Sequence, residues 1–166
     1  MYLKPLEQFI CDTCGNIIEN PEHGTVMWKY KTVNHQRVQY DFKIVHHFIH
    51  SPLVKDAGKN RCDPDEYPAT TKLTDFLSSV EHSNSLIHIL GFLDNGVAIQ
   101  KEFKGVNVEN IREYVEFIRR VTLPYYDEAR QYWNDAILEG AFGGYNEYII
   151  YTPEILQKII NTYKNR

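Results

Sequence analysis

Residues 24–46 alternate between apolar and polar positions in the way that β-strands do. A polar triplet, Asn34, His35 and Gln36, separates two runs of β-branched and aromatic residues. These runs consist of Thr25, Val26, Trp28, Tyr30, Thr32 and Val33, and of Val38, Tyr40, Phe42, Ile44 and Val45. The pattern therefore predicts a β-hairpin over residues 26–46 with its turn near Asn34.

Beyond residue 71 the apolar residues recur with the period of about 3.6 that is typical of amphipathic helices. Asn107 and Pro124 are expected to start two of these helices, and Gly140 to end one. Residues 51–71, rich in Pro, Gly, Lys, Asp and Asn, are expected to form a long loop. The helices are expected within residues 73–80, 86–93, 107–118, 124–140 and 153–163, and short extended segments within 97–103 and 145–151.

Because the strands come first and the helices follow without β-α-β alternation, the predicted fold class is α+β. We expect a metal-binding, β-rich head over residues 1–68 and a mainly helical domain over residues 72–166. The apolar stripes of the helices, including their many tyrosines, are interpreted as core.

The composition sets limits on the class of protein. The chain has 166 residues, 43% of them apolar and 24% charged, with a formal net charge of -4. These values fit one globular domain, or two small ones sharing a core, and argue against a protein that coats nucleic acid by bulk charge. The absence of an 18-residue apolar run and of a signal-peptide pattern at the N-terminus predicts a soluble cytoplasmic protein without membrane association.

One motif in the sequence indicates a chemical function, namely Cys11-x-x-Cys14-Gly15. Two thiolates at this spacing can bind one zinc ion from a tight turn, and the glycine permits the positive φ that such a turn needs. A closed structural zinc site takes four ligands, and the third cysteine, Cys62, supplies one more. The fourth is expected to be a histidine near the end of the second strand.

Three histidines are candidates for this position: His46, His47 and His50. In a regular strand His46 lies on the same side as the apolar Phe42 and Ile44, which favours His46, with His47 next. The predicted metal ligands are therefore Cys11, Cys14, His46 and Cys62. A disulfide or a thioredoxin-type redox pair is disfavoured, because no export signal and no β-α-β context accompany the C-x-x-C motif.

The order of motifs resembles a family of short uncharacterised bacterial proteins with a zinc-ribbon-like N-terminal head. The resemblance rests on the C-D-x-C-G motif, a Trp-bearing strand, the sequence Phe42-Lys43-Ile44-Val45-His46-His47, a later cysteine, and the segments 73–77, 86–90 and 124–130. It covers most of the chain. It implies the same architecture and the ligand set Cys11, Cys14, His46 and Cys62, and it implies no activity.

Three functions follow from these features. The first, a non-enzymatic binding or adaptor protein with a structural zinc and a protein partner, is favoured because the usual catalytic motifs are absent. The second is an HNH-type nuclease with His47 as general base and Asn60 as its orienting partner, although its second C-x-x-C is reduced to Cys62 and Asp63 and the next histidine, His82, is distant.

The third is a DNA-binding, winged-helix-like regulator in which the helix after Pro124 enters the major groove. Its acidic residues Asp127, Glu128, Asp135 and Glu139 outnumber Arg130 and argue against contact with phosphates. Nucleic acid is therefore a less favoured partner than protein.

Overall fold

The long β-hairpin predicted from the sequence is the centre of the fold. The structure, a computed structural model, describes residues 2–33, 36–53, 61–63, 66–77, 85–93 and 107–164. Strands β3 (Gly24–Val33) and β4 (Gln36–His46) pair antiparallel, from Gly24 opposite His46 to Val33 opposite Gln36. Strand β5 (Ala69–Lys72) adds to the other edge of β3, which gives the sheet order β4-β3-β5. A separate two-stranded sheet, β1 (Phe9–Ile10) with β2 (Ile17–Ile18), precedes the hairpin.

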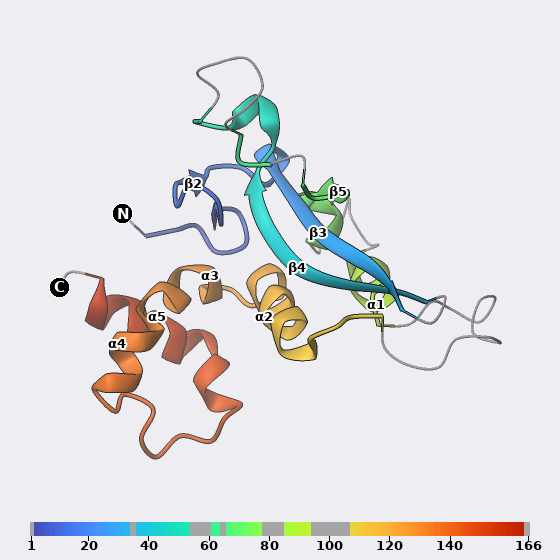
Figure 1. The fold of residues 1–166 in the computed structure, drawn as a ribbon. Coiled ribbons are helices and arrows are strands. Elements are labelled where there is room, and N and C mark those ends of the chain that lie inside the picture. The colour runs from blue at the N-terminus through green and yellow to red at the C-terminus, as the bar shows by residue number, and fades with distance from the viewer. Residues whose placement is uncertain are drawn as a thin grey trace.

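Helices follow the sheet along the chain, and Figure 1 shows α2 beside β4 with α3, α4 and α5 gathered on the side of α2 away from the distal end of the hairpin. The α-helices are α1 (Ser85–Gly91), α2 (Ile111–Thr122), α3 (Tyr126–Ala129), α4 (Trp133–Leu138) and α5 (Pro153–Tyr163). Short 3-10 helices lie at η1 (Pro21–His23), η2 (Phe48–His50), η3 (Leu73–Phe76), η4 (Arg130–Tyr132) and η5 (Ile149–Tyr151). The predicted α+β fold class is confirmed. None of the helices in the described ranges is long and apolar enough to cross a membrane.

A β-bulge interrupts the hairpin next to the core. Met27 lies opposite Lys43, whereas Lys29 lies opposite Tyr40, so Trp28 faces two residues of β4. One of these, Asp41, has a φ of 57°, the left-handed conformation that a bulge of this kind uses. The other is Phe42, whose backbone N–H donates to the Glu113 carboxylate of α2 at 3.0 Å. The bulge therefore gives α2 a direct backbone contact with β4.

Several expected element boundaries are wrong, and local pairing explains each. The loop expected over residues 51–71 ends earlier, because β5 pairs with β3. Helix α2 starts after Asn110, which caps it, because residues 107–109 are bonded to Gln39 of β4 in an extended conformation. The helix expected over 73–80 is the single 3-10 turn η3, since Leu77 is extended; residues 78–84 lie outside the described part.

The helix expected over 124–140 and the strand expected over 145–151 also differ from the structure. Tyr125 has a φ of 70°, so α3 starts at Tyr126. The 3-10 helix η4, whose last residue Tyr132 has a φ of -105° and a ψ of 8°, separates α3 from α4. Gly140 ends the segment as predicted, with a φ of 69°. Residues 145–151 form turns and η5 instead of a strand, so the described chain contains no wing at this position. The extended segment expected at 97–103 lies outside the described residues.

Two apolar clusters form the interior. The first joins the sheet to α1 and α2 through an aromatic group in which Phe42 stacks on Phe117, and Phe76 and Phe92 pack against them. The second lies among α3, α4 and α5 around Tyr126, Leu156 and Ile160. The first cluster contains residues from both the expected head and the expected helical domain, so packing links these two parts; their separate folding stays a prediction.

The structure also locates the buried stripe of α2, which differs from the expected one. Tyr114, Phe117 and Val121 face the sheet, whereas Ile111, expected inside, is 50% exposed. We expect Phe117→Ala to lower the free energy of unfolding by about 3–5 kcal/mol, because it leaves a cavity in the aromatic cluster. The control on the same helix, Ile111→Ala, should change it by no more than about 1 kcal/mol, since surface substitutions have small effects. Urea titration followed by circular dichroism measures both values.

Candidate metal centre

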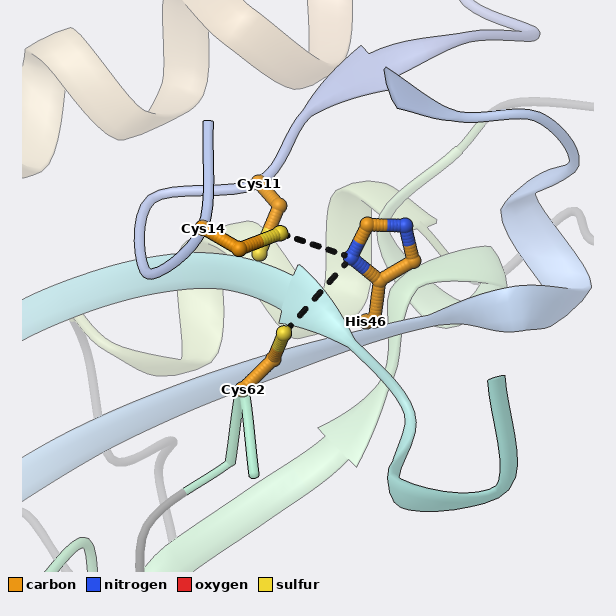
Figure 2. Close-up of side chains that lie close together, drawn as sticks. All are labelled: Cys11, Cys14, His46 and Cys62. Carbon is orange, nitrogen blue, oxygen red and sulfur yellow. Dashed lines mark hydrogen bonds between the residues drawn. The ribbon is translucent and has the colours of Figure 1, made fainter. Parts of the chain in front are cut away.

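Three cysteines and one histidine from separate segments meet at one point beside the end of β4. The ligand atoms of Cys11, Cys14, His46 and Cys62 all lie within 4.8 Å of one another. The Cys14 sulfur is 3.5 Å and the Cys62 sulfur 3.8 Å from Nδ1 of His46, as Figure 2 shows. Cys11, His46 and Cys62 are buried and Cys14 is half-buried. These four side chains can hold one metal ion.

The cysteine motif forms a tight turn between β1 and β2. The Cys11 N–H donates to the Asn16 carbonyl, and the Gly15 N–H donates to the Cys11 carbonyl at 2.9 Å. Gly15 has a φ of 72°, as expected from the motif, and no atom would meet a Cβ there, so its backbone conformation is what requires glycine. The turn is fixed to β4 through Asp12, whose N–H donates to the Ile44 carbonyl and whose carboxylate accepts from the Ile44 N–H. Both cysteines therefore lie close to His46, two residues further along β4.

His46 is held in the orientation that a metal ligand needs. Its Nε2 lies 3.2 Å from the Ile17 carbonyl oxygen, which can only accept a hydrogen bond. The proton is therefore on Nε2, and the lone pair of Nδ1 points to the sulfurs. Metal-binding histidines commonly have their second nitrogen fixed in this way. Of the candidate histidines, the structure brings His46 to the cysteines.

Cys62 lies in the short described segment 61–63 and is held by two hydroxyl groups. Thr13, from the cysteine turn, donates to the Cys62 backbone carbonyl at 2.7 Å. Ser51, which follows η2, lies 3.1 Å from the Cys62 sulfur and accepts from the Cys62 N–H at 3.2 Å. Both hydroxyls approach the residue that is most distant in sequence from the other ligands.

The other histidines lie outside the cluster. The ring of His47 lies against Phe48, with ring centroids 4.5 Å apart, and His50 stacks on His23 at 3.8 Å. Among the described residues the cysteine and histidine cluster is the one group that could hold a metal. Asn60, the orienting partner in the nuclease interpretation, lies outside the described residues, and so does His82, the next histidine after His50.

Burial changes the acid-base behaviour of the site. It raises the pKa of the Cys62 thiol from 9.0 to about 12, and it raises the pKa of Cys11 as well. Burial also lowers the pKa of His46, so the imidazole is neutral near pH 7. Without a cation the site is therefore occupied by protons, and a metal ion has to displace them from the sulfurs.

An ion-pair network connects the cysteine turn to the helices. Arg120 of α2 is 4% exposed and donates to Asp12 at 2.6 Å, to Asp127 of α3 and to the Ile10 carbonyl at 2.9 Å. Arg130 bridges the same two carboxylates, each at 3.0 Å. Asp127 also accepts from the Ile10 N–H at 2.6 Å. The network holds Ile10 and Asp12, at the start of the cysteine turn, against α2 and α3.

Sequence reasoning missed this network. It placed Asp127 and Glu128 on a surface that would repel phosphates, but both are buried, and Glu128 accepts from the Leu3 N–H and pairs with Lys164. The available signals were Asp12 inside the cysteine motif and the i, i+3 spacing of Asp127 and Arg130. Neither signal identifies Arg120, which is 108 residues from Asp12 in the chain.

The thiol pKa values give a pH dependence with a definite sign. In metal-free protein the folded state holds its thiol protons up to a higher pH than the unfolded state, so stability should fall as the pH rises from about 9 towards about 12. Bound metal should reverse the sign, because the thiolates then need to stay deprotonated and stability is lost as the pH falls.

Urea unfolding at several pH values between 8 and 10, with and without chelator, tests both signs. Buried tyrosines also have a raised pKa, among them Tyr114, so Cys62→Ala serves as the control. In the metal-free Cys62→Ala variant, the free energy of unfolding should fall less steeply with rising pH than in the metal-free wild type. A metal-free wild type whose stability is constant over this range would contradict the expectation.

The Arg120 network predicts a large loss of stability on substitution. Arg120→Met leaves the buried carboxylate of Asp127 and the partly accessible carboxylate of Asp12 with one guanidinium instead of two, and should lower the free energy of unfolding by about 3–5 kcal/mol. Arg112→Met, an exposed position on the same helix, should change it by about 0.5 kcal/mol or less. Denaturant titration at neutral pH gives both values, and equal effects of the two substitutions would refute the importance of the network.

In comparisons with known proteins, no protein-family model, no curated protein and no solved structure matches the chain.

Proposed function

We propose that the cluster of Cys11, Cys14, His46 and Cys62 is a structural zinc site in a non-enzymatic binding or adaptor protein. The observation that carries the proposal is the closed arrangement of four protein ligands within 4.8 Å of one another. Four ligands complete the tetrahedral coordination of zinc, so no position is left for water or substrate. A zinc ion in such a site contributes to folding and polarises no substrate.

The donor atoms support zinc as the metal. Thiolates are soft ligands that favour zinc over magnesium, calcium or manganese, and imidazole suits zinc as well. The ligands come from the β1-β2 turn, the end of β4 and the segment before β5, as in the zinc-ribbon-like head that the sequence resembles. One zinc ion would therefore join three segments that are separate in the chain.

The binding role is supported by exposed side chains away from the metal cluster. A groove of about 850 Å³ opens between α2 and η5, lined in part by Ile111, Val115, Tyr148 and Tyr151. Tyr148 is 73% exposed. Exposed tyrosines with apolar neighbours are common at protein interfaces, so a protein partner fits this surface.

The alternatives receive less support. For the nuclease, His47 lies against Phe48, and among the described residues it belongs to no group of three or more side chains that could hold a metal. For the winged-helix regulator, α3 has four residues, and its buried carboxylates are already paired, Asp127 with arginine and Glu128 with Lys164. Neither of these observations favours a nuclease or a DNA-binding regulator.

Metal analysis of matched variants tests the proposal. Protein purified without chelator should contain one zinc ion per chain, and His46→Ala, Cys11→Ser, Cys14→Ser and Cys62→Ser should each lose it. The control is His47→Ala, which removes the neighbouring imidazole and should retain the zinc. Elemental analysis by mass spectrometry gives the ratio; absence of zinc from the wild type, or its loss in His47→Ala with retention in His46→Ala, would contradict the ligand set.

A further inference from the structure

Among the described residues, the neighbours of the Ser51 hydroxyl group allow one assignment of its hydrogen bonds. Its oxygen accepts from two backbone N–H groups, those of Cys62 at 3.2 Å and Leu53 at 3.3 Å. A hydroxyl has two acceptor lone pairs and one proton. The two N–H groups use both lone pairs, so the proton is left for the third neighbour, the Cys62 sulfur at 3.1 Å. The surroundings of Ser51 thus require this sulfur to act as an acceptor.

A sulfur accepts such a bond most strongly when it is a thiolate, because the bond is then charge-assisted. The other buried thiol has different surroundings: burial raises the pKa of Cys11, and the backbone amides of Cys14, His46 and Thr13 oppose this rise. For Cys62 the side chain of Ser51 opposes the effect of burial, through a hydrogen bond of 3.1 Å to the sulfur.

Ser51 is itself fixed in place. It is 8% exposed and ends η2, where its N–H donates to the Phe48 carbonyl. It follows the ligand His46 by five residues, so one short turn positions both groups. Ser51 is not one of the four residues of the metal cluster, and its hydroxyl contacts the cluster at Cys62.

We propose that Ser51 is a positioning residue that orients the Cys62 sulfur as a metal ligand through its O–H···S hydrogen bond. This role rests on the proposed metal site. Loss of such a second contact to a metal ligand typically lowers metal affinity by about 10–100-fold. The hydrogen bond also lowers the energy of the sulfur lone pairs, so its removal should shift the sulfur-to-metal charge-transfer absorption to longer wavelength.

Thr13 provides a matched control, because it contacts the same ligand through the backbone. Its hydroxyl donates to the Cys62 carbonyl oxygen and leaves the sulfur untouched. Thr13→Val should weaken the placement of Cys62 without changing the charge on its sulfur. A purely structural role of Ser51 would make the two substitutions equivalent in the absorption spectrum.

The experiment uses the full chain with Co²⁺ as the probe, and compares wild type, Ser51→Val, Ser51→Thr and Thr13→Val. Threonine and valine have nearly the same shape, so the Ser51 pair differs in the hydroxyl alone. We expect Ser51→Val to bind Co²⁺ about 10–100-fold more weakly with a red-shifted thiolate band, and Ser51→Thr to keep the wild-type band and affinity. Thr13→Val should keep the band position.

The outcomes separate the two proposals. A wild type without a cobalt-thiolate band would contradict the metal site itself. A wild-type band that stays at the same wavelength in Ser51→Val, or that shifts equally in Thr13→Val, would overturn the role of Ser51 and leave the metal site in place. If Ser51→Val fails to fold, a Ser51→Thr variant whose band differs from wild type overturns the role, and one with the wild-type band and affinity supports it.

Discussion

The buried guanidinium of Arg120 is the contact on which the arrangement of the whole structure depends. It binds Asp12 in the cysteine turn, Asp127 in α3 and the Ile10 carbonyl of β1. A buried cation of this kind is tolerated only with complete compensation, and two carboxylates with a carbonyl provide it. The two apolar clusters meet at this point, so the ion pairs fix the orientation of α3 relative to the sheet and to the cysteine turn.

This constraint explains why the metal ligands can come from such distant parts of the chain. Asp12 is both a partner of Arg120 and a partner of the Ile44 backbone, so the helices and β4 are joined within the cysteine motif itself. His46 follows two residues later on β4. The position of Cys11 and Cys14 relative to His46 is therefore set by protein contacts.

The ligands differ in the way the protein supports them. Cys11 is held by the backbone hydrogen bonds of its own turn, His46 by the Ile17 carbonyl, and Cys62 by the hydroxyls of Ser51 and Thr13. Side-chain support is more easily removed by substitution than backbone support. If zinc binds as proposed, Cys62 is the ligand whose contribution is easiest to change without altering the fold.

The sequence by itself determined the features that depend on neighbouring residues. The alternation over residues 24–46 predicted the hairpin and the inward direction of His46, and the C-x-x-C-G spacing predicted the turn with its positive φ at Gly15. Tertiary structure alone decided where distant partners meet. The pairing of β5 with β3, the start of α2 after residues bonded to β4, and the burial of Arg120 with Asp127 all replace a local preference by a long-range contact. Charged residues carry no sequence signal of burial, because the ordinary position of a charge is in water, and the compensating partner here is 108 residues away.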